Sequence, residues 1–339
     1  MNNHTHSRST VALAVAGAVV CGALVALQSR INGELGAELG DGYLAAFISF
    51  GSGFFVMAVI ALVVPSIRRG VAGIIGAIRA GEIPWWYAVG GAAGALFVLS
   101  QGLTAAILGV ALFTVATVTG QTLSGLIVDR RGLGTMQPQP ITLLRVVGAG
   151  LAVVAVVFAV SPQLQNGTPP WALILPFAAG LGLGWQQAVN GQVRAVSGSA
   201  LTATFYNFAV GAALLAVVLG VHAIVSGLPE QLTGSPLLYT GGPIGIIFVA
   251  GYAIVVRYTG VLLLGLGAIA GQLAASVVFD LVVPVSERPL SWTTLAGTAL
   301  TLVAIGIASI PAGRAPSGTP PSAPPQTGPT PTRPTPSAR

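Results

Sequence analysis

Two short stretches carry amide side chains at the same spacing, 158 residues apart. Gln28 is followed four residues later by Asn32-Gly33, and Gln186 is followed by Asn190-Gly191. Residues four apart lie on one face of a helix, so each stretch presents two primary amides in the same direction. Each stretch closes a long apolar run, and an amide without a partner in hydrocarbon costs roughly 2–7 kcal/mol. The repetition predicts a duplicated polar site inside a membrane protein. Its amides are candidates for hydrogen bonding to a substrate in a cavity, with a cap or turn at the end of each run as an alternative for the Asn-Gly pairs.

Two further glutamines, Gln121 and Gln272, follow a glycine in the middle of an apolar run. An unpaired amide is most costly there, and transporter sites lie near the bilayer midplane, so we expect both side chains to line a substrate cavity. Gln101 and Asn207 are weaker candidates of the same kind. Hydrogen bonding between helices is the alternative for all of these amides.

Few ionisable residues fall within apolar runs. Asp280 follows a purely apolar segment and is the candidate for a residue that couples transport to protons, with a water-exposed place at the end of its run as the alternative. Asp129 precedes two arginines and is expected to form a surface ion pair, with Arg145 as another partner. His222 is expected to be a solvated residue at the end of a run, and Asp41 part of an acidic external loop.

The composition is that of a membrane protein. Of 339 residues, 54% are hydrophobic and only 6% are charged, whereas soluble domains carry about 25% charged residues. The 14 basic residues are all arginine and lie mainly between apolar runs and in the tails, which indicates membrane topology and argues against a nucleic-acid-binding surface. The single Cys21 excludes an internal disulfide. The sequence contains no catalytic or metal-ligand motif, so we expect neither an enzyme nor a cofactor.

Crossing the hydrocarbon core takes about 20 apolar residues. We read ten such runs: Val11–Ser29, Tyr43–Val64, Trp85–Thr104, Ala106–Val128, Ile141–Val160, Trp171–Asn190, Leu201–Val225, Tyr239–Tyr258, Val261–Val283 and Trp292–Ile310. The third and fourth runs almost touch, as do the eighth and ninth, so tight turns are expected within Gly102–Gly109 and at Thr259-Gly260. The fold class expected is therefore an all-α polytopic membrane protein with ten transmembrane helices.

The arginines predict the orientation of the chain. If the N-terminus is cytoplasmic, the cytoplasmic loops hold seven arginines and the external loops hold two, Arg30 and Arg288. Positive residues favour the cytoplasmic side, so both termini are expected inside. The expected organisation is a cytoplasmic tail (1–10), a first five-span repeat (11–160), an external linker (161–170), a second repeat (171–310) and a disordered Pro/Ser/Thr-rich tail (311–339).

The two halves match beyond the amide stretches. At an offset of 158, Gly40 and Phe50 fall on Gly198 and Phe208; at 151, Gly120-Gln121 and Asp129 fall on Gly271-Gln272 and Asp280; at 149, Gly148 falls on Gly297. Because each half holds an odd number of spans, the second must enter the membrane from the opposite side. Such inverted repeats provide two packings of similar energy, one open to each side, which is the basis of alternating access.

These features resemble the drug/metabolite transporter superfamily, and within it the YdcZ-like branch of bacterial inner-membrane proteins. The resemblance rests on the Asn-Gly that closes the first span of each half and on the Gly-Gln with a later Asp in the fourth. It implies ten helices around a central cavity and the export of small metabolites across the cytoplasmic membrane.

We therefore expect a transporter that moves a small, mostly neutral or amphipathic metabolite or drug-like molecule by alternating access, with the outward direction implied by the resemblance. A lipid or lipid-precursor translocase, a passive facilitator and a non-transporting scaffold are the alternatives. The expected partners are a small-molecule substrate, membrane lipid and protons as a coupling ion, with no nucleic acid. The sequence leaves monomer and homodimer open.

Overall fold

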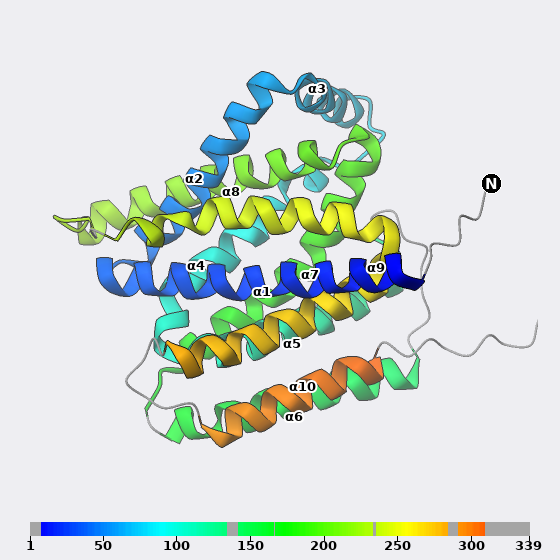
Figure 1. The fold of residues 1–339 in the computed structure, drawn as a ribbon. Coiled ribbons are helices and arrows are strands. Elements are labelled where there is room, and N and C mark those ends of the chain that lie inside the picture. The colour runs from blue at the N-terminus through cyan, green and yellow to red at the C-terminus, as the bar shows by residue number, and fades with distance from the viewer. Residues whose placement is uncertain (1–7, 134–141, 166, 233–234, 284–290, 309–339) are drawn as a thin grey trace, which may run out of the picture.

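The computed structural model describes residues 8–133, 142–165, 167–232, 235–283 and 291–308, and within these ranges the chain is helical without a strand (Figure 1). The elements are α1 (Arg8–Leu39), α2 (Gly42–Val63), α3 (Pro65–Arg79), η1 (Trp85–Val89), α4 (Gly91–Leu108), α5 (Val110–Arg131), α6 (Leu143–Gln165), α7 (Pro170–Ser197), α8 (Ala200–Ser226), η2 (Pro236–Thr240), α9 (Gly241–Val282) and α10 (Trp292–Ala308). The predicted C-terminal tail and most of the predicted N-terminal tail lie outside the described residues.

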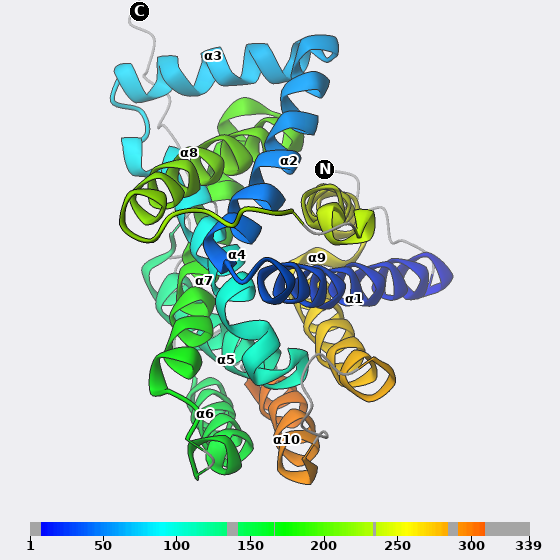
Figure 2. The same cartoon turned by 90° about the vertical axis from the view of Figure 1, so that its left-hand side faces the viewer.

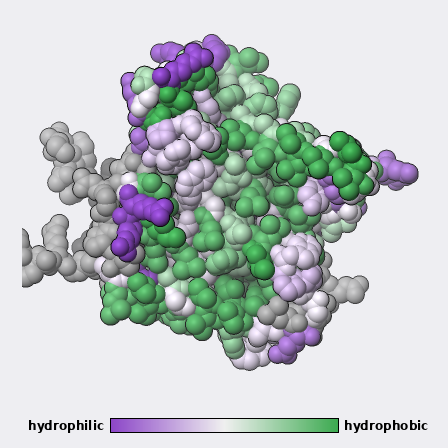
Figure 3. All heavy atoms as spheres, turned by 180° about the vertical axis from the view of Figure 1, so that it is seen from behind, coloured by the Kyte–Doolittle hydropathy of each residue, from purple (hydrophilic) through white to green (hydrophobic). Residues whose placement is uncertain are grey.

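Among the described residues, eight helices are long and apolar enough to cross a membrane. Two shorter apolar helices, Pro236–Tyr252 and Trp292–Ala308, lie where the eighth and tenth runs were predicted. The all-helical membrane class is confirmed in this form, and the count of ten spans stays a prediction. Large apolar side chains such as Phe55 and Val217 are exposed, and the surface in Figure 3 is mostly hydrophobic, as a lipid-facing surface must be.

The first helix of each repeat is longer than its apolar run. α1 continues to Leu39 and α7 to Ser197, past the predicted ends at Ser29 and Asn190. Each helix is followed by a glycine in the left-handed conformation, Gly40 with φ +64° and Gly198 with φ +68°, where other residues would be strained. The Asn-Gly pairs therefore lie inside helices, and the prediction of Arg30 in an external loop was wrong.

A short amphipathic helix, α3, lies between the second and third predicted runs, where a loop was expected. Its Ile67, Ile74 and Ala77 are buried, while Arg68 and Arg69 are exposed. Arg68 Nη1 donates to the carbonyl oxygen of Ala61 at 2.9 Å, at the end of α2. Figure 2 shows α3 crossing the end of α2 at a steep angle, as an interfacial helix would.

The junctions between the third and fourth spans differ in the two repeats. Gly109, with φ +79°, separates α4 from α5 and provides the predicted tight turn. The second repeat has one continuous element, α9, of 42 residues, where a turn at Thr259-Gly260 was predicted. A straight helix of that length would be about 63 Å long, twice the hydrocarbon thickness.

α9 instead turns back on itself, and both of its halves pack along α1 (Figure 1). Residue numbers fall along the first half of α9 as they rise along α1, whereas both rise together along the second half. The contacts that show this are Gln28–Gly245, Cys21–Gly251, Ala18–Gly267 and Gly22–Gln272. The two halves therefore run in opposite directions.

Equivalent residues of α6 and α10 contact one another reciprocally. Gly148 of α6 lies against Ala304 and Ala308 of α10, and its equivalent Gly297 lies against Ala155 and Ala159, which occupy the matching positions. A Cβ on either glycine would come within 2.5 Å of the partner helix. The order of these contacts makes α6 and α10 antiparallel, and they lie side by side in Figures 1 and 2.

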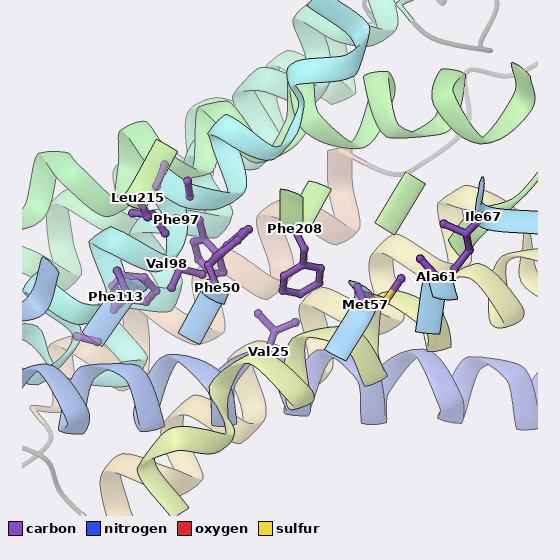
Figure 4. Close-up of a cluster of buried hydrophobic side chains, with 14 residues drawn as sticks. Val25, Phe50, Met57, Ala61, Ile67, Phe97, Val98, Phe113, Phe208 and Leu215 are labelled. Carbon is purple, nitrogen blue, oxygen red and sulfur yellow. The ribbon is translucent and has the colours of Figure 1, made fainter. Parts of the chain in front are cut away.

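The same reciprocity holds for α2 and α8. Phe50 and its equivalent Phe208 pack with ring centroids 5.1 Å apart, Gly53 lies against Phe208 and Gly211 lies against Phe50. These two helices are therefore also antiparallel. Figure 4 shows Phe50 and Phe208 within the largest buried apolar cluster, so a local two-fold relation passes through the core of the protein.

Candidate functional site

The first amide pair belongs to a buried hydrogen-bond network. Gln28 Nε2 donates to the Gly241 carbonyl at 2.7 Å, and Asn32 Nδ2 donates to Gln101 Oε1 at 2.7 Å. Gln101 Nε2 in turn donates to Ser29 Oγ at 2.9 Å. The network ties α1 to α4 and to the start of α9, so it joins the first repeat to the second.

Two oxygen atoms beside this network have no hydrogen-bond partner among the described residues: Asn32 Oδ1 and Ser49 Oγ, both buried. Both lie against Gly241, where a Cβ would be 2.2 Å from Asn32 Oδ1 and 2.7 Å from Ser49 Oγ. Only a glycine allows α9 to approach this closely. The two oxygens are acceptors that a donor group of a ligand can use if α9 moves away from α1.

The second amide pair forms an equivalent network in the other repeat. Gln186 Nε2 and Asn190 Nδ2 both donate to Asn207 Oδ1, the latter at 3.4 Å. Gly90 and Gly94 stand where Gly241 and Gly245 stand in the first network, with a Cβ on Gly90 placed 2.9 Å from Asn190 Oδ1 and one on Gly94 placed 2.8 Å from Gln186 Nε2. The two networks are therefore related by the same two-fold relation as the helices.

The networks are equivalent without being identical, because Asn207 stands where the first repeat has Ser49 and Tyr252 stands where it has Gln101. The two amide networks lie on either side of the Phe50–Phe208 pair. A Cβ on Gly94 would meet both Gln186 and Phe50, and one on Gly245 would meet both Gln28 and Phe208. The structure therefore brings four of the six predicted amides to one apolar seam between the repeats.

The other two amides, Gln121 and Gln272, lie elsewhere. Gln272 is buried on the second half of α9, with its backbone nitrogen 2.9 Å from a Cβ placed on Gly22. Gly22 precedes Gln28 by six residues, which is about 9 Å along a helix. Gln121 is half-buried on α5, and its backbone carbonyl oxygen would lie 3.3 Å from a Cβ on Gly184. The structure does not bring these glutamines into the amide networks.

Asp280 caps the first turn of α5. Its Oδ1 accepts from the backbone nitrogen of Val110 at 2.9 Å, and its Oδ2 accepts from that of Ala111 at 2.7 Å. A Cβ on Gly109 would lie 2.9 Å from Oδ2, so glycine is needed for the carboxylate to reach the helix. The start of a helix carries partial positive charge and favours an anion, which gives Asp280 a favourable place among apolar helices.

The described residues form three ionic contacts. One of them, between Asp129 and Arg145, was expected as an alternative, and the other two were not expected. Asp129 meets Arg145 at 3.1 Å, as one of the expected alternatives had it. His222 was expected to be solvated, but its Nε2 lies 3.3 Å from Asp41 Oδ2 and its ring stacks on Tyr43 with centroids 4.2 Å apart. The third contact joins Arg30 to Glu34 at 3.1 Å within α1.

Two pairs of glycines spaced four residues apart let neighbouring helices pack closely. Gly180 and Gly184 lie against α5, with a Cβ on Gly180 only 2.0 Å from the Thr117 carbonyl oxygen, and Gly267 and Gly271 lie against α1. Close approach of backbones is the usual role of such motifs in membrane helices. Among the described residues, no group of three or more His, Cys, Asp or Glu side chains is arranged to hold a metal ion.

A model of the family described as "Putative inner membrane exporter, YdcZ" matches the chain twice, over residues 13–158 and 171–307. No curated protein matches the chain. One solved structure, described only as "Crystal structure of protein", is 16% identical, with a TM-score of 0.52 over 91% of this chain and 100% of the other. That likeness shows a shared fold alone. The two successive family matches show that the chain contains the same domain twice.

Proposed function

Because this chain belongs to the YdcZ family of inner membrane exporters, we propose that it exports a small metabolite by alternating access between its two repeats. The family and the apolar helices establish a multi-pass protein of the inner membrane. Substrate, mechanism and the orientation of the termini belong to the proposal.

The observation that carries the proposal is the reciprocal packing of the repeats. Two pairs of equivalent helices, α2 with α8 and α6 with α10, are antiparallel, which supports an inverted relation. An inverted relation gives the chain two packings of similar energy, since each repeat can adopt the arrangement of the other. One packing opens the seam to the cytoplasm and the other opens it to the outside.

The seam favours a small neutral or amphipathic substrate. It combines the aromatic pair Phe50–Phe208 with two flanking sets of amides, which hydrogen-bond polar groups without attracting strong charge. In the state described here these amides are bonded to protein groups. Opening of either side has to release some of them, and the substrate then supplies the replacement partners.

Cysteine labelling tests the inverted relation directly. Ala37 and Ala195 are equivalent positions, both exposed near the ends of α1 and α7, and alanine to cysteine is a small change. In a Cys21→Ala background, Ala37→Cys should react with an impermeant maleimide from outside the cell and Ala195→Cys only after the membrane is opened. Reaction of both from the same side would show parallel repeats and end the alternating-access proposal.

A comparison of metabolites accumulated by cells with and without the protein tests the transport activity. An exporter leads to intracellular accumulation of its substrate when it is deleted, and purified protein in vesicles should move that compound. A fusion reporter at Arg339 checks the expected cytoplasmic C-terminus.

We further propose Asp280 as the coupling residue, because it is a half-buried carboxylate at the junction between α9 and α5. Asp280→Asn should abolish gradient-driven flux in vesicles and spare substrate exchange. Driven flux at the wild-type rate would remove Asp280 from this role.

A further inference from the structure

Arg30 is a buried cation that neither the amide networks nor the coupling role uses. It lies in α1 between the two amides of the first pair, and its side chain is 9% exposed. Its Nη2 donates to Glu34 Oε2 at 3.1 Å, one helical turn further on. Glu34 is itself 38% exposed, so this contact lies at the edge of the protein.

The other amino group of the guanidinium, Nη1, is buried and has no hydrogen-bond partner among the described residues. A buried donor left without an acceptor is destabilising, and more so when it carries charge. Ala188 stands at the equivalent position in the second repeat, so the two-fold relation of the fold does not require an arginine here.

Arg30 lies in α1 between Gly22, which lies against Gln272 in the second half of α9, and Gly33, which lies against Ala105 and Ala106 at the end of α4. Asp280 follows Gln272 by about two helical turns and is bound to the first turn of α5. This place thus combines a guanidinium with a free amino group and the positive end of a 22-residue helix. Both groups attract anions, and guanidinium pairs well with carboxylate. Asp280 is the anion that occupies the helix start in this state.

We propose that Arg30 Nη1 and the first N–H groups of α5 form a binding site for a carboxylate of the transported molecule, and that Asp280 holds this site when the molecule is absent. The substrate class is then an amphipathic monocarboxylate, with its apolar part toward the seam. The inference rests on the proposed function for the identity of its ligand, but the site can be tested without transport.

Binding to the purified full-length protein in nanodiscs provides the test. The probes are acetate, butyrate and benzoate, each compared with its neutral amide at the same pH and ionic strength, by calorimetry and thermal shift. At least one carboxylate should bind and its amide should not. Arg30→Gln should weaken that binding roughly 10- to 100-fold, the effect of losing a charge-assisted hydrogen bond. Arg145→Gln, which removes an arginine outside the site, should leave it unchanged.

Asp280→Asn supplies a second and opposite readout, which stays informative if Arg30→Gln does not fold. Removal of the resident carboxylate should strengthen binding of the same probe. Equal binding of carboxylates and amides, no binding of any carboxylate, unchanged binding in folded Arg30→Gln, or no gain in Asp280→Asn would each overturn the site. If carboxylates bind as expected but vesicles show no flux, the proposed function fails and the site stands.

Discussion

Replacement of Gln101 by leucine tests whether the first amide network stabilises the fold. Gln101 is fully buried in α4 and links two residues of α1, accepting from Asn32 at 2.7 Å and donating to Ser29 at 2.9 Å. Leucine has a similar size and removes both bonds. Asn32 Oδ1 already has no partner among the described residues, so the Asn32 amide would lose its remaining hydrogen bond.

The expected cost follows from these two bonds. Hydrogen bonds between membrane helices contribute roughly 0.6–2 kcal/mol each, so Gln101→Leu should lower the free energy of unfolding by about 1–4 kcal/mol. The upper part of that range is expected, because a buried amide without any partner carries its full desolvation cost.

Reversible unfolding in mixed micelles, followed by tryptophan fluorescence, measures this free energy. Gln187→Leu is the matched control, since it makes the same chemical change at an exposed amide of α7, and it should stay within about 0.5 kcal/mol of the wild type. If Gln101→Leu is as stable as Gln187→Leu, the network does not hold α1 to α4 and the reasoning is wrong.

Three further predictions concern packing, flux and surface charge. Gly180→Ala would place a Cβ 2.0 Å from a carbonyl oxygen of α5 and should destabilise the protein by about 1–3 kcal/mol in the same unfolding assay, whereas Gly125→Ala meets nothing within 4 Å and should not destabilise it. Asn190→Ala should reduce flux in vesicles at normal levels of folded protein, because Asn190 belongs to the second amide network beside the seam; full flux would take that amide out of the transport pathway. Asp129→Asn breaks a partly exposed ion pair and should change stability by less than about 1 kcal/mol, so a larger loss would indicate a buried role.

Local pattern predicted much of the fold and part of the site. Apolar runs gave the helices, and matched amides, glycines and phenylalanines gave the duplication, because lipid demands both apolar surface and paired polar groups. The equivalence of Gln28 with Gln186 is visible in the sequence, and the structure gives both a place in matching networks.

The errors came from contacts that hydropathy cannot see. A hydropathy reading ends a span at the first charge, so it ended the first one before Arg30, whose charge is paired with Glu34 one turn further along α1. The amphipathic α3 does have a signal, the spacing of its buried Ile67, Ile74 and Ala77, which a search for long apolar runs passes over. The His222–Asp41 contact joins non-equivalent positions of the two repeats, so no internal comparison could have found it.

The packing of α1 has a consequence for how the chain holds together. Its main neighbours are the two halves of α9, and α7 likewise lies against α4 and α5, so the leading helix of each copy is clasped by the opposite copy. Neither copy is a self-contained unit: parted from its twin, each would bare glycine-lined grooves and unmatched amides to lipid. The two copies thus form an interlocked dimer within a single polypeptide. A substitution at this interface in one copy has an equivalent position at the same interface in the other copy.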